Sequence, residues 1–81
     1  MKKIENNECL HDFGEFIRKE RERRELSQEE VAQMVGIHRT YYGKIELARR
    51  EVDLFTAMAI CKALKIDLSD FIKNYMKKET P

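Results

Sequence analysis

The segment GIHRTYYGKIE, residues 36–46, carries the side chains with the most informative chemistry. In a helix, Arg39, Thr40, Gly43 and Lys44 would fall on one side, with Tyr42 and Ile45 on the other. Arginine and lysine can donate to the O6 and N7 atoms of guanine, and threonine can bond a base edge or touch a thymine methyl. We therefore expect this face to contact bases in the major groove of DNA.

The remaining residues of the segment divide between two faces. Tyr42 and Ile45 are expected to pack in the core, and Tyr41 lies at the border, where packing and a DNA contact both stay open. Gly43 has no side chain and would let the helix approach the floor of the groove. His38 is expected to mark the start of the helix.

Basic residues beside this segment could contact the phosphate backbone, which positions a protein without specifying a sequence. Arg18, Tyr41, Arg49 and Arg50 are expected to flank the base-contacting face. The alternative for the arginines, and for Lys19 and Arg23, is a solvated charged surface. Glutamates at positions 15, 20, 22 and 25 alternate with the basic residues before residue 26, and this favours the alternative there.

The composition limits how much this chain can do. Its 81 residues, 42% of them hydrophobic, suffice for one small domain with a single core. The formal net charge of +1 does not by itself indicate a nucleic-acid partner, so a binding surface must arise from local clustering of basic residues. No apolar run is long enough for a signal peptide or a membrane span, and we expect a soluble cytoplasmic protein without membrane contact, associated with the nucleoid.

Apolar spacing predicts five helices and no strand. Leu10, Phe13 and Ile17 predict a helix ending near Arg24. Ser27 and Glu30 form a capping-box pattern, which predicts a helix over 28–35 that stops at Gly36. The third helix is expected from 39 to 46 or 47.

Two further helices follow the loop after residue 47. Asp53 is expected to cap the fourth, whose core stripe is Leu54, Ala57, Met58, Cys61 and Leu64. Asp67 is expected to cap the fifth, with apolar residues Leu68, Phe71, Ile72, Tyr75 and Met76. Residues 1–9 are expected to form a flexible arm, residues 10–78 the single domain, and residues 79–81 a tail.

Neither a metal site nor an enzyme is supported by the remaining reactive residues. Cys9 and Cys61 lack metal-ligand spacing, and no second histidine accompanies His11 or His38 at such spacing. Ser27, His38 and Asp53 could be written as a catalytic triad, but the capping box already accounts for Ser27. We expect no catalytic residue, metal or cofactor.

The stretch LSQEEVAQMVGIHRTYYGKIE resembles the helix-turn-helix of the Cro/C1-type (XRE) family of DNA-binding repressors. The shared features are Gln28 at the start of the second helix, Ala32 at its small packing position, Gly36 in the turn, and Ile45 before Glu46. The pattern extends from about Phe13 to Phe71. Within the family, HRTY before a glycine and an IE pair is most similar to restriction–modification controller proteins.

This resemblance implies a lambda-repressor-like fold of five helices with the helix-turn-helix over about 28–47. It also implies a regulator that binds palindromic operators in double-stranded DNA as a homodimer, with RNA polymerase as a further partner. Gln28 matches the family's phosphate-contacting glutamine, and Arg21 and Glu46 match positions joined by a structural ion pair. Glu25, Ala48 and Lys65 depart from the pattern, since glycine is common there and a left-handed residue other than glycine costs free energy. Glu51 and Glu20 also depart from it, and a carboxylate at 51 would repel phosphate.

Apolar residues on the last two helices exceed what so small a core needs. We expect Phe55, Met58, Phe71, Tyr75 and Met76 to form a homodimer interface. The alternative is a protein-interaction module, antitoxin-like or adaptor, that uses the same fold without reading DNA. The oligomeric state and the binding of selected against random DNA would separate the two.

Overall fold

The computed structural model describes residues 6–79, with side chains from residue 8 to residue 74. Within that range the chain folds into five helices and no strand, as the apolar spacing predicts. These are α1 (Asn6–Arg23), α2 (Gln28–Val35), α3 (Arg39–Glu46), α4 (Leu54–Ala63) and α5 (Leu68–Glu79). The boundaries of α2, α3 and α4 agree with the expected caps at Ser27, His38 and Asp53.

The first helix begins earlier than expected, at Asn6 instead of Leu10. Residues 6–9 are therefore helical, and the prediction of a flexible arm fails for them. Glu8 in the first turn favours a helix start, and Cys9 packs against the edge of the core. Residues 1–5 and 80–81, which include the rest of the predicted arm and most of the tail, lie outside the described residues.

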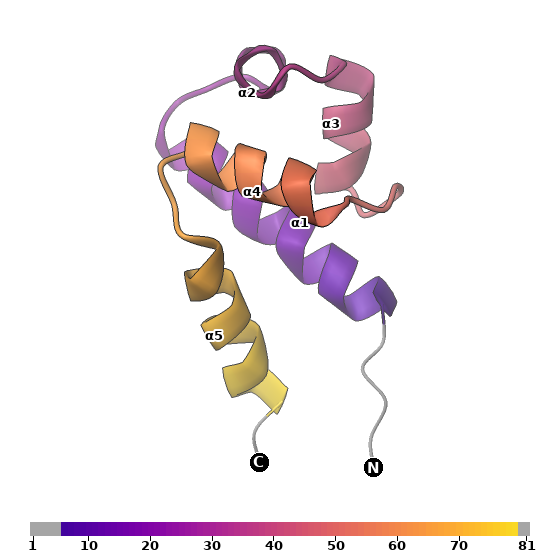
Figure 1. Cartoon of the computed structure of the whole chain (residues 1–81), viewed down its shortest axis with the longest axis vertical. Helices are drawn as coiled ribbons and strands as arrows, with labels where there is room; N and C mark the ends of the chain where they lie inside the picture. The colour runs from indigo at the N-terminus through magenta and orange to yellow at the C-terminus, as the bar shows by residue number, and fades with distance from the viewer. Residues whose placement is uncertain (1–5, 80–81) are drawn as a thin grey trace.

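The helices arrange around α1, which runs through the molecule as its longest element (Figure 1). α3 packs on both α1 and α2, α4 packs on α2, and α5 packs on α1 and α4. Figure 1 places α2 at one end of the molecule and α5 at the other. The exposed side of α3 is thereby left uncovered by the other four helices.

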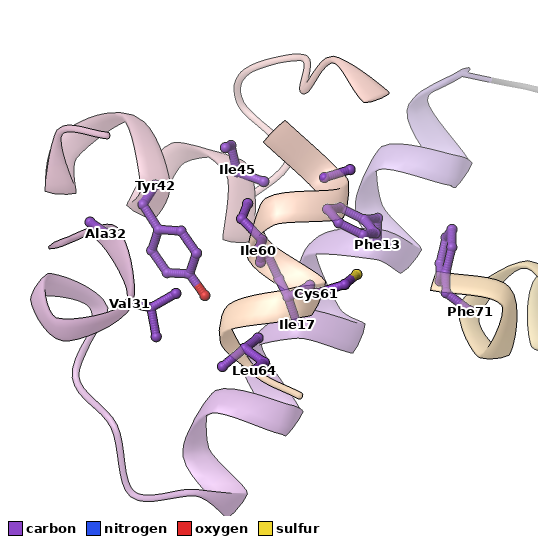
Figure 2. Packing of buried hydrophobic residues seen from close by; sticks show 11 residues of the cluster. Phe13, Ile17, Val31, Ala32, Tyr42, Ile45, Ile60, Cys61, Leu64 and Phe71 are labelled. Atoms are coloured by element: carbon purple, nitrogen blue, oxygen red, sulfur yellow. The ribbon is translucent and has the colours of Figure 1, made fainter. Parts of the chain in front are cut away.

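The core is formed by side chains from all five helices (Figure 2). Tyr42 and Ile45 of α3 are buried as expected, and the Tyr42 ring lies next to Val31 and Ala32 of α2. The buried set in the described residues is Phe13, Ile17, Val31, Ala32, Tyr42, Ile45, Ala57, Ile60, Cys61, Leu64 and Phe71. Such burial is the main favourable contribution to folding.

Leu54 and Met58 lie outside the core stripe predicted for α4, although exposure of Met58 agrees with its other expected place at an interface, and Phe71 is not exposed as an interface residue would be. Leu54 and Met58 are 61% and 51% exposed, because they lie on the flank of the buried stripe that Ala57 and Ile60 share with Cys61 and Leu64. Phe71, expected at a dimer interface, is buried instead: its ring centroid lies 5.3 Å from that of Phe13 and 5.5 Å from that of Phe16.

The first four helices end in the same way, although only one has a glycine at the turn. Gly36, Glu25, Ala48 and Lys65 all adopt positive φ, between 56° and 86°. At each end the next residue donates its backbone N–H to a carbonyl five residues back, for example Arg49 to Lys44 at 2.8 Å. The three departures from glycine therefore do not abolish this cap, and the chain adopts it at some cost in strain.

Two contacts along α1 explain its close packing. A Cβ atom at Gly14 would come within 2.5 Å of the Glu46 carbonyl oxygen, so α1 and α3 could not approach this closely with a larger residue. Glu20 accepts hydrogen bonds from Arg23 and Arg24, and Arg24 also reaches the Lys65 carbonyl. Glu20 thus helps Arg24 link the ends of α1 and α4.

Candidate nucleic-acid interface

The start of α3 is fixed by local contacts in α2, in the turn after it and at the first residues of α3 itself. Ser27 and Glu30 form the expected capping box at the start of α2, with contacts of 3.0 and 2.8 Å. Gly36 reverses the chain after α2. His38 then caps α3, because its Nδ1 atom accepts a hydrogen bond from the Thr40 backbone N–H at 3.0 Å.

The exposed side of α3 and the neighbouring helices line one shallow hollow. The residues that line it come from α1, α2, α3 and the residue after α3: Arg18, Arg21, Gln28, Glu29, Arg39, Thr40, Gly43, Lys44, Glu46 and Leu47. Arg39, Thr40 and Lys44 are thus brought together with Gln28 and Arg18, as the sequence predicts. Arg49 and Arg50 lie on the exposed loop after α3, outside this hollow.

The cations on α3 are available to an external anion. Within residues 8–74, Arg39 and Lys44 form no ion pair, and the first turn of α3 contains no acidic residue. Arg18 is less free, since it lies 3.4 Å from Glu22, and Lys19 pairs with Glu15 at 3.2 Å. The solvated-surface alternative therefore fits Lys19, whereas Arg18 both pairs and lines the hollow.

A polar network under the hollow joins α1, α2 and α3. Glu46 accepts hydrogen bonds from Nε of Arg21 at 2.7 Å and from its Nη2 at 3.1 Å, and Arg21 also donates to the Leu26 carbonyl at 2.8 Å. Gln28 donates from Nε2 to the same carboxylate at 2.9 Å. The ion pair expected between Arg21 and Glu46 is therefore present. Glu46 is only 6% exposed, so its carboxylate is buried.

Glu46 stays ionised in this buried position because its partners outweigh desolvation. Burial by itself would raise the pKa of Glu46, but the bonds from Arg21 and Gln28 and the nearby Tyr42 hydroxyl lower it below its ordinary value. Burial, followed by the adjacent Glu46 carboxylate, raises the pKa of Tyr42. By distance and angle the Tyr42 hydroxyl has no hydrogen-bond partner among the residues that the structure describes, so its link to Glu46 is electrostatic.

Tyr41 connects α3 to the loop that follows it. Its hydroxyl donates to the Glu51 carbonyl at 3.3 Å, and the Arg50 guanidinium lies 5.3 Å from the centre of its ring. The Tyr41 side chain also packs partly against the core. Tyr41 therefore holds Arg50 and the loop beside α3, a role that the sequence did not reveal.

Two further residues of the hollow were missed from the sequence. Leu47 is 61% exposed directly after α3, and Glu29 lies in the first turn of α2. Leu47 follows Lys44 by three residues, and this spacing was a usable signal because residues three or four apart lie on one side of a helix. Glu29 adjoins Gln28, so spacing gave no such signal for it. Leu47 adds an apolar surface, and Glu29 a negative charge, to an otherwise basic face.

Comparison with known proteins now decides the family. A helix-turn-helix family model matches residues 17–71. The chain belongs to the helix-turn-helix family. This match covers the Cro/C1-type pattern recognised in the sequence, and it runs from the second half of α1 into α5.

Relatives in this helix-turn-helix family are named as control proteins. The chain is 44% identical over 60 residues to control protein C.SmaI from Serratia marcescens, which covers 69% of this chain and 71% of that protein. It is 37% identical over 73 residues to control protein C.MunI from Mycoplasma sp, covering 89% of this chain and 99% of the relative. The predicted similarity to controller proteins is thus confirmed, and these relatives are regulators and not enzymes.

Solved structures of two restriction–modification controller proteins share the fold. C.AhdI from Aeromonas hydrophila matches with a TM-score of 0.73 at 34% identity, over 76% of this chain and 94% of that one. C.Esp1396I matches with a TM-score of 0.75 at 26% identity, over 85% of this chain and 91% of that one. The lambda-repressor-like fold predicted from the helix-turn-helix pattern is therefore confirmed.

Other chemistry finds little support in the part of the chain that the structure describes. No three His, Cys, Asp or Glu side chains gather there as a metal site would require. Burial raises the pKa of Cys61 to about 11, so this thiol remains protonated and unreactive at neutral pH. Among the described helices, none is long and apolar enough to cross a membrane.

Proposed function

We propose that this helix-turn-helix protein is a sequence-specific regulator of transcription that binds palindromic operators in double-stranded DNA as a homodimer. The observation that carries the proposal is the pair of cations without ion-pair partners in the described residues, Arg39 and Lys44, with Thr40 on the exposed side of α3. An α-helix fits the major groove, and side chains near its N-terminus reach base edges there. Arg39 and Thr40 are the first two residues of α3.

The roles of these residues follow from their chemistry. Arg39 reads guanine through a two-bonded contact, Lys44 contacts the same acceptors as a point charge, and Thr40 bonds a base or touches a thymine methyl. Gln28, His38, Tyr41 and Gly43 flank this readout, together with Arg18, Arg49 and Arg50. The flanking side chains that donate hydrogen bonds to phosphate fix the orientation of the protein on DNA.

A homodimer follows from the demands of specificity. One recognition helix reads too few base pairs to compete with non-specific genomic sites, whereas two read a palindrome whose half-sites lie about 34 Å apart. Phe55 and Met58 on α4 are exposed and apolar, and they support α4 as the interface. Phe71 is left out because it is buried within the monomer, and the side chains of Tyr75 and Met76 lie outside those described.

The names of the relatives suggest the biological setting. C.SmaI and C.MunI are control proteins, and C.AhdI and C.Esp1396I are controllers of restriction–modification systems. By analogy, this chain controls the transcription of such a system, in the cytoplasm with the nucleoid and with RNA polymerase as the machinery on which it acts.

Selection of bound sequences from a random pool of DNA duplexes tests this function. The wild type is expected to enrich a palindrome. Arg39→Ala should lose the preference at one guanine position in each half-site, which corresponds to roughly 1–3 kcal/mol of discrimination. Arg49→Ala should weaken binding to all sequences alike, and Lys19→Ala, which removes an exposed cation of α1 paired with Glu15, should bind as the wild type does.

A wild type that enriches no sequence, and binds every duplex alike, would exclude operator recognition. The same fold would then serve as a protein-interaction module, with the exposed apolar residues of α4 as its contact surface. A uniform loss of affinity in Arg39→Ala would assign Arg39 to phosphate contact instead of base readout.

A further inference from the structure

The side chain of Gln28 is held in one position by two neighbours on α3. Its Nε2 atom donates to Oε1 of Glu46 at 2.9 Å. Because a carboxylate only accepts hydrogen bonds, this contact turns the NH2 group toward Glu46 and leaves the amide oxygen on the other side. The orientation of the carboxamide is therefore determined by its partner.

Gly43 leaves the space in which this carboxamide lies. A Cβ atom at position 43 would come to 3.2 Å from Oε1 of Gln28, 3.8 Å from Cδ and 4.0 Å from Nε2. The first of these distances is shorter than an ordinary van der Waals contact, so alanine would displace the carboxamide by a few tenths of an ångström. The absence of a side chain at Gly43 thus serves Gln28, whether or not it also lets α3 approach DNA.

The anchor of Gln28 is itself rigid. Glu46 is buried and is bound by two nitrogen atoms of Arg21, whose guanidinium also bonds the Leu26 carbonyl. An NH2 group has two N–H donors, and Glu46 uses only one of them. The second has no acceptor within residues 8–74 and can bond an external one at the hollow that Gln28 lines with Arg39 and Lys44.

We propose that Gly43 is a positioning residue for DNA binding: it leaves room for Gln28 to lie on Glu46, so that the second N–H of Gln28 is directed at a backbone phosphate before DNA arrives. The inference rests on the proposed function, because it assigns a phosphate contact within the same surface. Ordering a flexible side chain on binding weakens affinity roughly two- to tenfold, because rotamer freedom is lost. A side chain that is ordered before binding avoids this cost.

A double-mutant cycle tests the inference on the duplex selected by the wild type. Gly43→Ala and Gln28→Ala are each expected to raise the Kd roughly two- to tenfold, and the double variant should bind no more weakly than Gln28→Ala alone. Fluorescence anisotropy with labelled duplex measures all four proteins. If Gly43→Ala raises the Kd by the same factor in the Gln28→Ala background as in the wild type, the added methyl group itself touches DNA, and the inference is overturned. Full affinity of the Gly43→Ala single variant would overturn it as well.

Two further measurements exclude a general structural effect. Gly43→Ala disturbs the hydrogen bond from Gln28 to Glu46 but places the better helix former in α3, so it should lower the Tm no more than Gln28→Ala does. Glutamine carries no charge, so neither single variant should change the slope of log K against log salt, whereas Arg49→Ala should reduce it by about 0.9. Weaker binding together with a Tm below that of Gln28→Ala would count against a positioning role.

The two proposals fail in different ways. A wild type that selects no sequence removes the proposed function, and the phosphate contact of Gln28 with it. A wild type that selects a palindrome while the cycle is additive leaves the proposed function intact and removes only the positioning role of Gly43.

Discussion

Glu46 is the residue on which the recognition surface of this helix-turn-helix protein depends most. It lies under the hollow, accepts hydrogen bonds from Arg21 of α1 and Gln28 of α2, and belongs to α3 itself. A buried charge that loses its partner destabilises a protein strongly, because the remaining charge is desolvated without compensation. Glu46 therefore connects the stability of the fold to the geometry of the binding face.

The ionisation of Glu46 predicts a loss of stability in acid. Its pKa is lower in the folded protein than its ordinary value, so the folded state binds fewer protons than the unfolded state in that range. The stabilisation is complete above the ordinary value of 4.5 and is lost as the pH falls through the folded pKa. Glu46→Gln should cost about 3 kcal/mol at pH 7, and its difference from the wild type should shrink at pH 3.

Urea unfolding at both pH values checks this prediction. Glu51→Gln serves as the control, because Glu51 is exposed and lies outside the network; its free energy of unfolding should match that of the wild type at both pH values. A Glu46→Gln difference of equal size at pH 3 and pH 7 would show that the charge of Glu46 is not the source of its contribution.

At the scale of the elements, the backbone is strained at the ends of α1, α3 and α4. Glu25, Ala48 and Lys65 adopt the left-handed conformation at φ of 56°, 59° and 57°, where a side chain crowds the backbone. The hydrogen bonds of the cap and the burial of the following apolar residue hold them there. Leu26 and Ile66, which follow two of these positions, both pack against the core.

Glycine at the end of α1 should stabilise the protein. Glu25 is exposed, so Glu25→Gly relieves the strain without removing packing, and we expect a gain of about 1 kcal/mol. In a domain of this size that gain raises the Tm by roughly 4–8 °C in a thermal melt. Gln33→Gly, at an exposed position inside α2, should instead lower stability by roughly 0.5–1 kcal/mol. Equal effects at the two positions would contradict strain at Glu25.

At the scale of the whole molecule, the exposed apolar residues fall on different sides. Phe55 is 79% exposed and Met58 lies nearby on α4, whereas Met34 lies on α2. α2 and α4 both pack on the core, and α3 occupies a third side with the basic hollow. An interface on α4 leaves α3 free for DNA, as a dimer on a palindrome requires.

Disruption of the α4 surface should separate the dimer without unfolding the monomer. Phe55→Glu places a charge where two apolar surfaces would meet, and we expect a monomer by light scattering coupled to size exclusion at micromolar concentration. The same variant should bind the selected palindrome much more weakly, while a thermal melt shows that the monomer is still folded. Met34→Glu is the matched control and should remain dimeric. A dimeric Phe55→Glu together with a monomeric Met34→Glu would move the interface to α2.

The sequence by itself determined the helices and the position of the helix-turn-helix segment. Capping residues, Gly36 and apolar spacing act within a few residues, so Ser27, His38 and Asp53 mark helix starts correctly and Tyr42 and Ile45 are assigned to the core. Only the tertiary structure decided that Phe71 is buried, that Leu54 is exposed, and that Gln28 lies over Gly43 on Glu46. These outcomes depend on how helices distant in sequence are oriented, which local spacing does not encode.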